Sequence, residues 1–524
     1  MMLRPLSTSV LAALLAAVAC GGEVKTYRLP AQPPAPPPKP SAQPPAPSFE
    51  SPGGMWLPSQ LGSAHAETLR KLGLELEPEK LADPMAYPLG AVISLGGCSA
   101  SFVSPDGLVI TNHHCVTAAL QYNSTPEKNL LELGYVAKGF EDEPSIGPTG
   151  RVFVTQAFHD VTARMRDGIE QIADDKARHD AMEKREKEII AECEKAKSDV
   201  RCEVASYFGG AQYLSIERLE IKDVRLVYAP AEGVGNFGGE IDNWRWPRHG
   251  GDFSFYRAYV GKDGKPGEYA KDNVPYKPRQ HLKLPSKPLG AGDLVFVAGY
   301  PGRSYRLYTA YETEEAVNWY YPYRVRFCEE LLTAVDRAKK GDADVAIKAT
   351  PLERGLNNAL TYTRGTLEGL SQGGAADQRR KAEQELEGWV NADPARQKMY
   401  ADAFAKLHDA FAEQQKTRDL DAVLGEMLRI PSLLGATFSI VRLAEERPKP
   451  DADRDPDYQE RNWQRLEQTQ QALEKRYSRK LDVATLSEIA ARAKRLLPAD
   501  QRALLLRPLT GQSDPTLEQI ATAV

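Results

Sequence analysis

The sequence predicts an α+β protein in which a β-rich part, residues 55–302, precedes a helical part, residues 303–524. Two observations favour this class. Short apolar runs separated by turn residues, which are typical of strands, recur up to Gly302. Beyond Tyr305 the chain is highly charged and its apolar residues follow the helical period, with few strand-like runs. We therefore expect a sheet domain followed by a helical domain.

The β-rich part begins with the runs AVISL, SASFVS and LVITN, and the turn residues Pro105 to Gly107 separate the last two. A charged segment with helical spacing of its apolar residues interrupts the strands at about residues 160–200. Strands return in SIERLEIKDVRLVYAP and DFSFYRAYVG, and the apolar run DLVFVAGYPG, residues 293–302, is expected to close this part. Helices are expected over residues 310–340, 376–416 and 457–496.

The composition is that of an ordinary globular chain. Hydrophobic residues make up 42% and charged residues 27% of the 524 residues. The formal net charge is -5 and no basic run stands out, so nothing in the charge pattern indicates binding to nucleic acid or to an anionic membrane surface. We expect neither as a partner.

The N-terminus predicts export. Arg4 precedes an apolar run, Val10 to Ala19, which is followed by Cys20 and two glycines. A basic start and a short apolar run are typical of a secretory signal, residues 1–20, and small residues before a cysteine resemble a lipoprotein signal in which Cys20 is lipidated. Ordinary cleavage near Ala19 is the alternative. We expect an exported protein, in the periplasm or at the outer membrane or cell surface of a bacterium.

Residues 21–54 are rich in proline and lack core-forming residues, so we expect an extended linker. Such a segment would hold the globular part away from a lipid anchor. No later segment contains about 18 uninterrupted apolar residues, which is the length that spans a bilayer. Contact with a membrane is therefore expected only through a lipid on Cys20.

Export permits disulfides. Apart from Cys20, the cysteines form two pairs of sequence neighbours and one single residue: Cys98 with Cys115, Cys193 with Cys202, and Cys328. We expect Cys193 and Cys202 to pair and to close a short loop, and two free buried thiols are the alternative. None of the spacings is typical of a zinc finger or a zinc ribbon.

The stretch VSPDGLVITNHHC, residues 103–115, places two histidines beside a cysteine after a predicted strand. Adjacent side chains on a strand point to opposite faces, so His113 and His114 are poorly placed to share one metal ion. The sequence also has no His-Glu-x-x-His helix. We therefore expect no metal ion. A catalytic base and ordinary hydrogen-bonded histidines remain as the two interpretations.

A second segment joins a glycine-rich loop to a strand: GVGNFGGEIDNWRWPRHGGDFSFYR, residues 233–257. Asp252 stands at the start of this strand, where a carboxylate could orient an imidazole, and it follows the histidines in the chain. This order is that of trypsin-like enzymes. Taken alone, the glycines and tryptophans could serve packing, and Asp252 could be a turn residue.

Together the two segments resemble the bacterial dipeptidyl-peptidase 7 and dipeptidyl-peptidase 11 family of serine exopeptidases. The matching stretches are SFVSPDGLVITNHHC, FGGEIDNWRWPRHGGDFSFYRAY, GDLVFVAGYPGRSYR and, more loosely, RGLNNALTYTRGTLEGL, in this order over residues 85–370. The resemblance implies a chymotrypsin-like double β-barrel interrupted by a large helical domain. It also implies removal of dipeptides from peptides with a free N-terminus, without a cofactor, and relatives with this architecture can form homodimers.

The resemblance implies a layout around the histidines. In the first barrel of trypsin-like proteases the catalytic histidine directly precedes a cysteine that is bonded to an upstream strand. By this correspondence His114, rather than His113, is the general base, and Cys98 pairs with Cys115.

The second segment is matched in the same way. Asp252 corresponds to the carboxylate that orients the base. Asn243 and Trp244 correspond to the pair that holds the α-amino group of the substrate. Without the family match, Asn243 would be interpreted as a loop-capping side chain.

The serine nucleophile of this family lies in a Gly-Asn-Ser-Gly-Ser turn of the second barrel, after the helical domain. No serine of this sequence has such surroundings; the candidates are Ser99, Ser304, Ser371 and Ser513. We therefore expect the first barrel to be present, the second barrel to be missing and the helical domain to be incomplete. As it stands the chain is expected to lack peptidase activity, whether as a truncated peptidase or as a non-catalytic exported lipoprotein that binds peptide N-termini.

Overall fold

The computed structural model describes residues 56–523 except 63–64, 196, 198, 242, 291, 301 and 303–307. The expected signal peptide 1–20, the expected lipidation site Cys20 and the expected linker 21–54 lie outside the described residues. One unit, Met55–Leu289 together with Asp293–Val524, contains the sheet, the helices and both disulfides.

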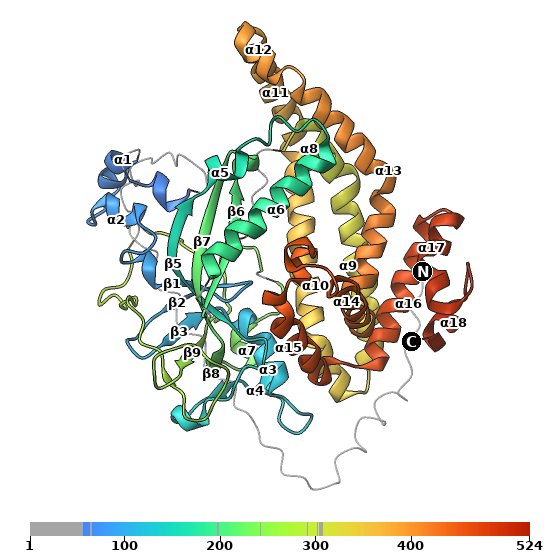
Figure 1. The fold of residues 1–524 in the computed structure, drawn as a ribbon. Coiled ribbons are helices and arrows are strands. Elements are labelled where there is room, and N and C mark those ends of the chain that lie inside the picture. Colours follow the sequence, from blue (N-terminus) through green and yellow to red (C-terminus); the bar gives the residue numbers. More distant parts are fainter. Residues whose placement is uncertain are drawn as a thin grey trace, which may run out of the picture. The chain divides into compact units, whose positions relative to one another are not determined.

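The described strands form one ten-stranded sheet (Figure 1). Their order is β4-β8-β9-β3-β2-β1-β5-β7-β6, β10 pairs with β9 outside this path, and neighbouring strands are antiparallel. This ladder has two ends, β4 and β6, so the chymotrypsin-like barrel stays a prediction. The strands are β1 (Val92–Ser94), β2 (Ser99–Phe102), β3 (Leu108–Thr111), β4 (Tyr135–Val136), β5 (Val152–Asp160), β6 (Val200–Tyr207), β7 (Gln212–Ile221), β8 (Asp223–Ala229), β9 (Ser254–Val260) and β10 (Val274–Pro275).

The hairpin between β2 and β3 forms at the Pro-Asp-Gly turn. Phe102 lies opposite Val109 in this pair. Gly107, at the turn, has a φ of 68°, and a Cβ atom there would lie 2.8 Å from the main-chain oxygen of Ala258. Glycine is therefore required both by the backbone conformation and by the close approach of β9.

The strand expected at residues 293–302 is wrong. Among the described residues of this run none belongs to a strand, and Val297 is fully exposed, at 102%. An apolar run becomes a strand only where a neighbouring strand offers hydrogen-bonding partners, and none of the described strands does so here. The run is instead anchored at Tyr300, whose N–H donates to Ser99 Oγ at 2.7 Å and whose hydroxyl bonds to Thr155 Oγ1 at 2.9 Å.

Two helices follow β5 in the charged segment of the β-rich part. These are α5 (Thr162–Arg166) and α6 (Asp175–Glu194), and Asp174 caps α6 by accepting the N–H of Ala177 at 2.7 Å. A disulfide between Cys193 and Cys202 joins the end of α6 to the edge strand β6. The expected pairing of these two cysteines is confirmed.

Cationic side chains connect α6 and the edge strand β6 to the helical part of the chain. Arg461, in α15 (Glu460–Arg476), donates to the main-chain oxygen of Cys202 at 2.8 Å and forms an ion pair with Glu194. Lys187 of α6 is buried and donates to the main-chain oxygen of Arg454 at 2.6 Å. Because a buried ammonium needs several acceptors, these contacts fix how α6 meets the helices.

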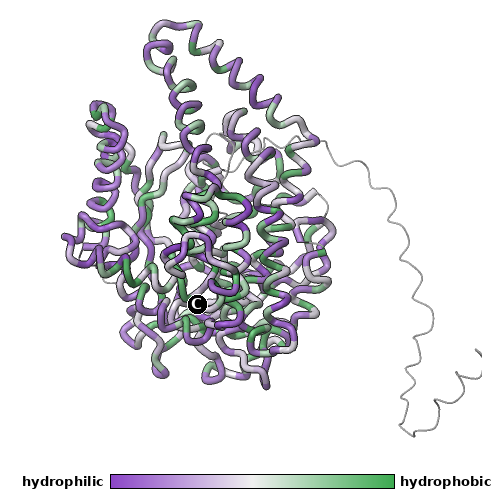
Figure 2. The backbone as a smooth tube through the Cα atoms, turned by 90° about the vertical axis from the view of Figure 1, so that its right-hand side faces the viewer, coloured by the Kyte–Doolittle hydropathy of each residue, from purple (hydrophilic) through white to green (hydrophobic). Residues whose placement is uncertain are grey.

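Four long helices build the helical core: α9 (Tyr321–Lys339), α10 (Ala343–Gln372), α13 (Ala403–Arg429) and α16 (Arg479–Leu496). Hydrophilic and hydrophobic residues alternate along the helices in Figure 2, as expected when each helix buries one face. Cys328, on α9, is a free thiol at 0% exposure in this core, and burial raises its pKa. The structure therefore gives this cysteine a packing role.

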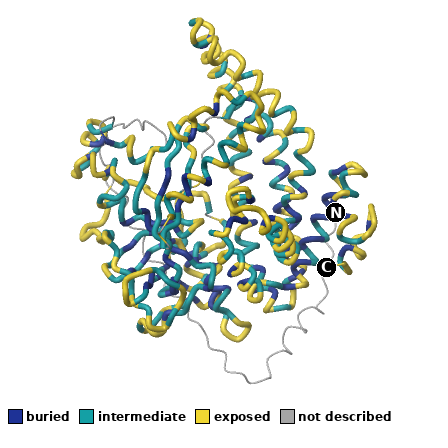
Figure 3. The backbone as a smooth tube through the Cα atoms, viewed as in Figure 1, coloured by how far each residue is buried: buried dark blue, intermediate teal, exposed yellow. Residues whose placement is uncertain are grey.

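The remaining helices are shorter or lie more at the surface. In Figure 3, α11 and α12 are mostly exposed. In the described part of the chain no single helix has the length and apolar composition to cross a membrane, although the bent pair Pro394–Arg429 and Ser432–Glu446 passes by length and composition. The shorter or more exposed helices are α1 (Ala66–Lys71), α2 (Pro78–Ala82), α3 (Thr117–Tyr122), α4 (Leu130–Leu133), α7 (Glu232–Gly235), α8 (Ala310–Glu315), α11 (Ala375–Asn391), α12 (Pro394–Tyr400), α14 (Ser432–Glu446), α17 (Ala499–Thr510) and α18 (Leu517–Ala523).

The helical core encloses a charged network. Arg492 of α16 is 1% exposed, and its Nε donates to Glu426 at 3.3 Å while the guanidinium also pairs with Glu330. The same guanidinium lies 4.6 Å from the centroid of the Tyr323 ring, and the Tyr323 hydroxyl donates to Glu426 at 2.7 Å. Burial raises the pKa of the Glu426 carboxyl, and Arg492 opposes that rise. The network therefore depends on the arginine.

Arg492→Met is expected to lower the free energy of unfolding by about 3–5 kcal/mol, because it removes the charge that is paired directly with the buried Glu426. The double variant Arg492→Met with Glu426→Gln is expected to recover part of this loss, since a neutral amide needs no counter-charge. Denaturant unfolding followed by circular dichroism measures both variants. Equal losses in the single and the double variant would contradict the account.

Candidate active site

Strand pairing brings the two predicted catalytic segments together. β3 pairs with β9 so that Thr111 lies opposite Ser254. The chain continues from Thr111 into a 3₁₀ turn, His113–Val116, and Asp252 precedes β9 by two residues. In an antiparallel pair, residues just after one strand and just before the other share one edge of the sheet. His114 and Asp252 are neighbours for this reason.

His114 is held by Asp252 through two kinds of bond. Its ring Nδ1 lies 3.0 Å from Oδ2 and 3.2 Å from Oδ1 of the carboxylate, and its main-chain N–H donates to Oδ1 at 3.1 Å. The side chain of His114 is 62% exposed, whereas that of Asp252 is 11% exposed. With Nδ1–H donating to the carboxylate, Nε2 carries the lone pair that can accept a proton.

Two further side chains support the carboxylate of Asp252, and the sequence did not point to either. The amide of Asn112 donates to Oδ2 and to the main-chain oxygen of Asp252, both at 3.2 Å, and Arg248 donates to Oδ2 at 3.2 Å. Burial by itself would raise the pKa of Asp252. The side-chain bond and charge of His114, its main-chain N–H and Arg248 outweigh burial and lower this pKa to about 2.

His113, the neighbouring histidine, has a different environment. It is 1% exposed, and its ring fills the space beside Gly235, where a Cβ atom would lie 2.5 Å from the ring. Burial, followed by the charge of Arg354, lowers the pKa of His113 to about 4, so the ring is neutral at neutral pH. Its Nε2 has no hydrogen-bond partner among the described residues. The structure thus places His114, and not His113, against the carboxylate.

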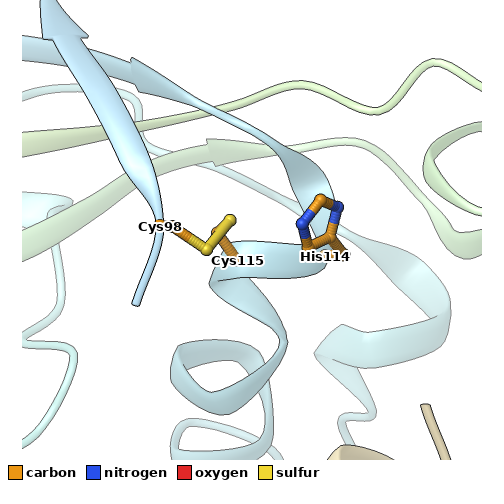
Figure 4. A group of neighbouring side chains, drawn as sticks. All are labelled: Cys98, His114 and Cys115. Carbon is orange, nitrogen blue, oxygen red and sulfur yellow. A yellow bond between two sulfur atoms is a disulfide. The ribbon is translucent and has the colours of Figure 1, made fainter. Parts of the chain in front are cut away.

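Figure 4 shows a disulfide between Cys98 and Cys115 beside His114. The pairing implied by the trypsin-like layout is confirmed. Ligand atoms of these three residues lie within 4.8 Å of one another, a spacing that would suit a metal ion. Because the disulfide uses both sulfur atoms in a covalent bond, no thiolate remains as a ligand. The cluster holds the histidine turn in place and is not a metal centre.

Asn243 and Trp244 lie in the loop that leads to Asp252, and both contact helix α10. The side-chain oxygen of Asn358 accepts hydrogen bonds from the Asn243 amide and from the Trp244 indole N–H, each at 3.0 Å. The Asn243 amide also donates to Glu240. Trp244 has a φ of 60°, which the surrounding bonds must stabilise because a tryptophan rarely adopts it.

Asn358 is a further residue of the candidate site that sequence reasoning missed. It lies in the stretch RGLNNALTYTRGTLEGL, which matches the family only loosely, and nothing in a helical pattern tells which asparagine faces a distant loop. The structure assigns it because α10 brings it to Asn243 and Trp244. The predicted catalytic residues and the predicted substrate-binding residues therefore fall into two groups, His114 with Asp252 and Asn243 with Trp244.

Residues 51–524 match the family model described as Peptidase S46. The chain belongs to this peptidase family. The resemblance inferred from the motifs is confirmed, because curated members of the family that match the chain are a dipeptidyl-peptidase 7 and an Asp/Glu-specific dipeptidyl-peptidase.

Two relatives give the extent of the likeness. The chain is 41% identical over 409 residues to the Asp/Glu-specific dipeptidyl-peptidase of Shewanella putrefaciens, and 34% identical over 361 residues to dipeptidyl-peptidase 7 of Capnocytophaga gingivalis. The alignments cover 78% and 68% of this chain, and 55% and 50% of the relatives. The chain thus spans about half the length of the curated relatives that it matches.

The fold is similar to that of Porphyromonas endodontalis DPP11 in complex with the dipeptide Arg-Glu, with a TM-score of 0.73 and 26% sequence identity. The superposition covers 89% of this chain and 67% of that one. The same enzyme in complex with Arg-Asp gives a TM-score of 0.72.

The lowered pKa of Asp252 makes stability depend on pH. The carboxyl has a pKa of 3.8 in an ordinary environment and about 2 here. Because the folded-state value is the lower one, the ionised carboxylate contributes stability above about pH 4, and this contribution is lost as the pH falls toward about 2.

Asp252→Asn is expected to lower the free energy of unfolding by about 2 kcal/mol at neutral pH, and the difference from the unchanged chain should shrink between about pH 4 and 2. Denaturant unfolding at a series of pH values measures this difference. Asp263→Asn, at an exposed turn, serves as the control and should change stability by less than about 0.5 kcal/mol. A difference for Asp252→Asn that stays constant with pH would contradict the account.

Proposed function

We propose that this chain carries the base and the N-terminus-binding groups of a serine-type dipeptidyl-peptidase, which removes dipeptides from peptide N-termini by acyl transfer. The observation that carries the proposal is the 3.0 Å bond between Nδ1 of His114 and the carboxylate of Asp252, next to a loop that contacts Asn358. The names of the relatives support release of dipeptides, and a dipeptide is bound in the similar DPP11 structure.

The chemistry assigned to the pair is general base catalysis. Nε2 of His114 takes the proton of the nucleophile as it attacks the peptide carbonyl, and gives it to the leaving amine. Asp252 holds the ring in the required tautomer and stabilises the imidazolium that forms. Because its pKa is about 2, Asp252 stays ionised throughout the pH range in which His114 can act as a base.

No bond among the described residues joins a serine hydroxyl to His114. The nearest candidate in the histidine hairpin, Ser99, accepts the N–H of Tyr300 at 2.7 Å. We place the nucleophile in the part of the relatives that this chain does not span, since the alignments cover only 55% and 50% of them. The 524 residues would then supply the base and its carboxylate, and the missing part would supply the serine and the oxyanion hole.

The substrate's α-amino group is assigned to the loop and α10. An ammonium has three N–H donors and needs oxygen acceptors in fixed positions. The side-chain oxygens of Asn243 and Asn358, and the carboxylate of Glu240, are grouped there by the bonds that the Asn243 amide makes to both neighbours. A substrate without a free N-terminus would bring no ammonium to these acceptors and would lose the charge-assisted bonds, which lowers its affinity.

A non-catalytic binder of peptide N-termini is the second candidate function. Asn243, Trp244 and Asn358 all lie within this chain, whereas the described residues bring no serine to His114. Such a protein would need only the loop and α10.

We also propose that the protein works outside the cytoplasm, as an exported and lipid-anchored protein. Two disulfides, Cys98–Cys115 and Cys193–Cys202, support this location because cytosolic thiols are kept reduced. The apolar run before Cys20 supports the anchor.

The chain is expected to bind the dipeptide Arg-Glu at least about tenfold more tightly than its N-acetylated form, because charge-assisted bonds to an ammonium are worth about 1.5–3 kcal/mol. Asn358→Ala should abolish this preference. Asn357→Ala, the neighbouring position on α10, is the matched control and should keep it. Isothermal titration calorimetry measures the six affinities of the three proteins for the two peptides, and equal binding of the free and the acetylated peptide by the unchanged chain would refute the proposal.

The purified chain is expected to release no dipeptide from a dipeptidyl chromogenic substrate above the uncatalysed rate. A chimera that joins it to the part of the Shewanella relative that the alignment does not cover should gain turnover. His114→Ala should remove that activity, since a triad histidine is worth several orders of magnitude. Turnover by the chain alone would place a nucleophile within it. A folded chimera that binds Arg-Glu without turnover would favour the binder.

A further inference from the structure

One face of α10 contacts the site at three successive turns. Arg354, Asn358 and Tyr362 are spaced by four residues, so they lie in a row on the same side of the helix. Asn358 bonds to Asn243 and Trp244, and the Tyr362 ring lies 5.2 Å from the Trp244 ring. Arg354 contacts different elements, which are those around the histidines.

Arg354 joins the two segments that enclose the histidine turn. Its guanidinium donates to Thr117 Oγ1 and to Glu232, each at 2.9 Å, and its side chain is 15% exposed. Thr117 begins α3, directly after the 3₁₀ turn that carries His114, and α10 lies against α3 (Figure 1). Glu232 begins α7, a single turn that ends at Gly235.

The bond between Arg354 and Glu232 is connected to His114 through the packing of α7 against His113. Gly235 closes against the ring of His113, where an added Cβ atom would lie 2.5 Å away, so α7 cannot shift without moving His113. His113 is 1% exposed and is bonded to His114 through the main chain. A rigid, close-packed contact of this kind transmits displacement rather than absorbing it. Arg354 therefore contacts the segments that lie on both sides of the histidine turn.

We propose that Arg354 is a positioning residue, which couples the occupied N-terminus site at Asn358 to the catalytic histidine turn through one face of α10. The inference rests on the proposed function and deepens it. Four residues of helix separate Arg354 from Asn358 by about 6 Å along the axis. One rigid helix face therefore contacts both the loop of Asn243 and the segments beside the histidine turn.

The coupling is tested in the complete chain with ¹⁵N-labelled histidine and tryptophan. Addition of Arg-Glu is expected to shift the indole signal of Trp244 and the ring signals of His114, which His114→Gln and Trp244→Phe identify. In Arg354→Met the dipeptide should still bind, with an affinity within about threefold, but the His114 response should fall to about one third or less. Arg364→Met, on the same helix and paired with Glu329, is the matched control and should keep both responses.

Several outcomes would overturn the inference. One is that the His114 signals of Arg354→Met shift as far as those of the unchanged chain when Arg-Glu is added. Another is that Arg-Glu shifts the Trp244 signal of the unchanged chain but not the His114 signals. Neither outcome contradicts the proposed function. Arg354→Lys keeps the charge beside Glu232, but a lysine cannot bond to Thr117 and Glu232 at the same time as the guanidinium does. The His114 response of this variant should therefore be intermediate. Arg354→Lys replaces Arg354→Met if that variant does not fold.

If the unchanged chain does not bind Arg-Glu, the result counts against the proposed function. Amide hydrogen exchange of the chain without peptide then tests the positioning role of Arg354 separately. In Arg354→Met the amides of residues 113–118 and 232–235 are expected to exchange at least about tenfold faster, with residues 243–244 unchanged. Arg364→Met should alter neither segment. Unchanged exchange at both segments in Arg354→Met would overturn the positioning role.

Discussion

The antiparallel pairing of β3 with β9 is the constraint on which the candidate site depends. Val109 lies opposite Tyr256, and both are almost fully buried, so the core fixes the register that also sets Thr111 opposite Ser254. A slip by one residue would turn the buried residues of β3 to the other face of the sheet, at a large cost in burial. The same slip would separate His114 from Asp252. The geometry of the candidate site is therefore a consequence of core packing, although neither residue belongs to a strand.

A carboxylate in so buried a position stays ionised only if donors surround it. Asp252 receives them from the two ends that β3 and β9 bring together: Asn112 and the main chain of His114 on one side, Arg248 on the other. The carboxylate then accepts one further hydrogen bond, from Nδ1–H of the His114 ring. His113, one residue earlier, is packed away from water and uncharged at neutral pH. The two adjacent histidines thus have opposite environments, and this difference cannot be predicted from their identity in the sequence.

The sequence allowed the parts of the site that are local to be predicted. Turn residues and apolar runs mark the strand ends where His114 and Asp252 stand, and the family resemblance then singled out these two residues and the disulfide. Asn358 could not be predicted, because its role depends on which face of a long helix meets a loop more than a hundred residues away. Residues 293–302 were wrongly predicted as a strand for a related reason, since apolar alternation shows that a segment can pair but not that a partner exists.

The helical part contributes to the site itself and does more than cover it. The oxygen of Asn358 accepts bonds from both Asn243 and Trp244, so the loop keeps its conformation, including the positive φ of Trp244, only while α10 is in place. The acceptors proposed for a substrate's ammonium therefore come from two elements and exist as a group only when those elements are packed together. If the proposed function holds, a site built in this way links recognition of a free N-terminus to the packing of α10. Any movement of α10 would change the N-terminus site and, through Arg354, the histidine turn at the same time.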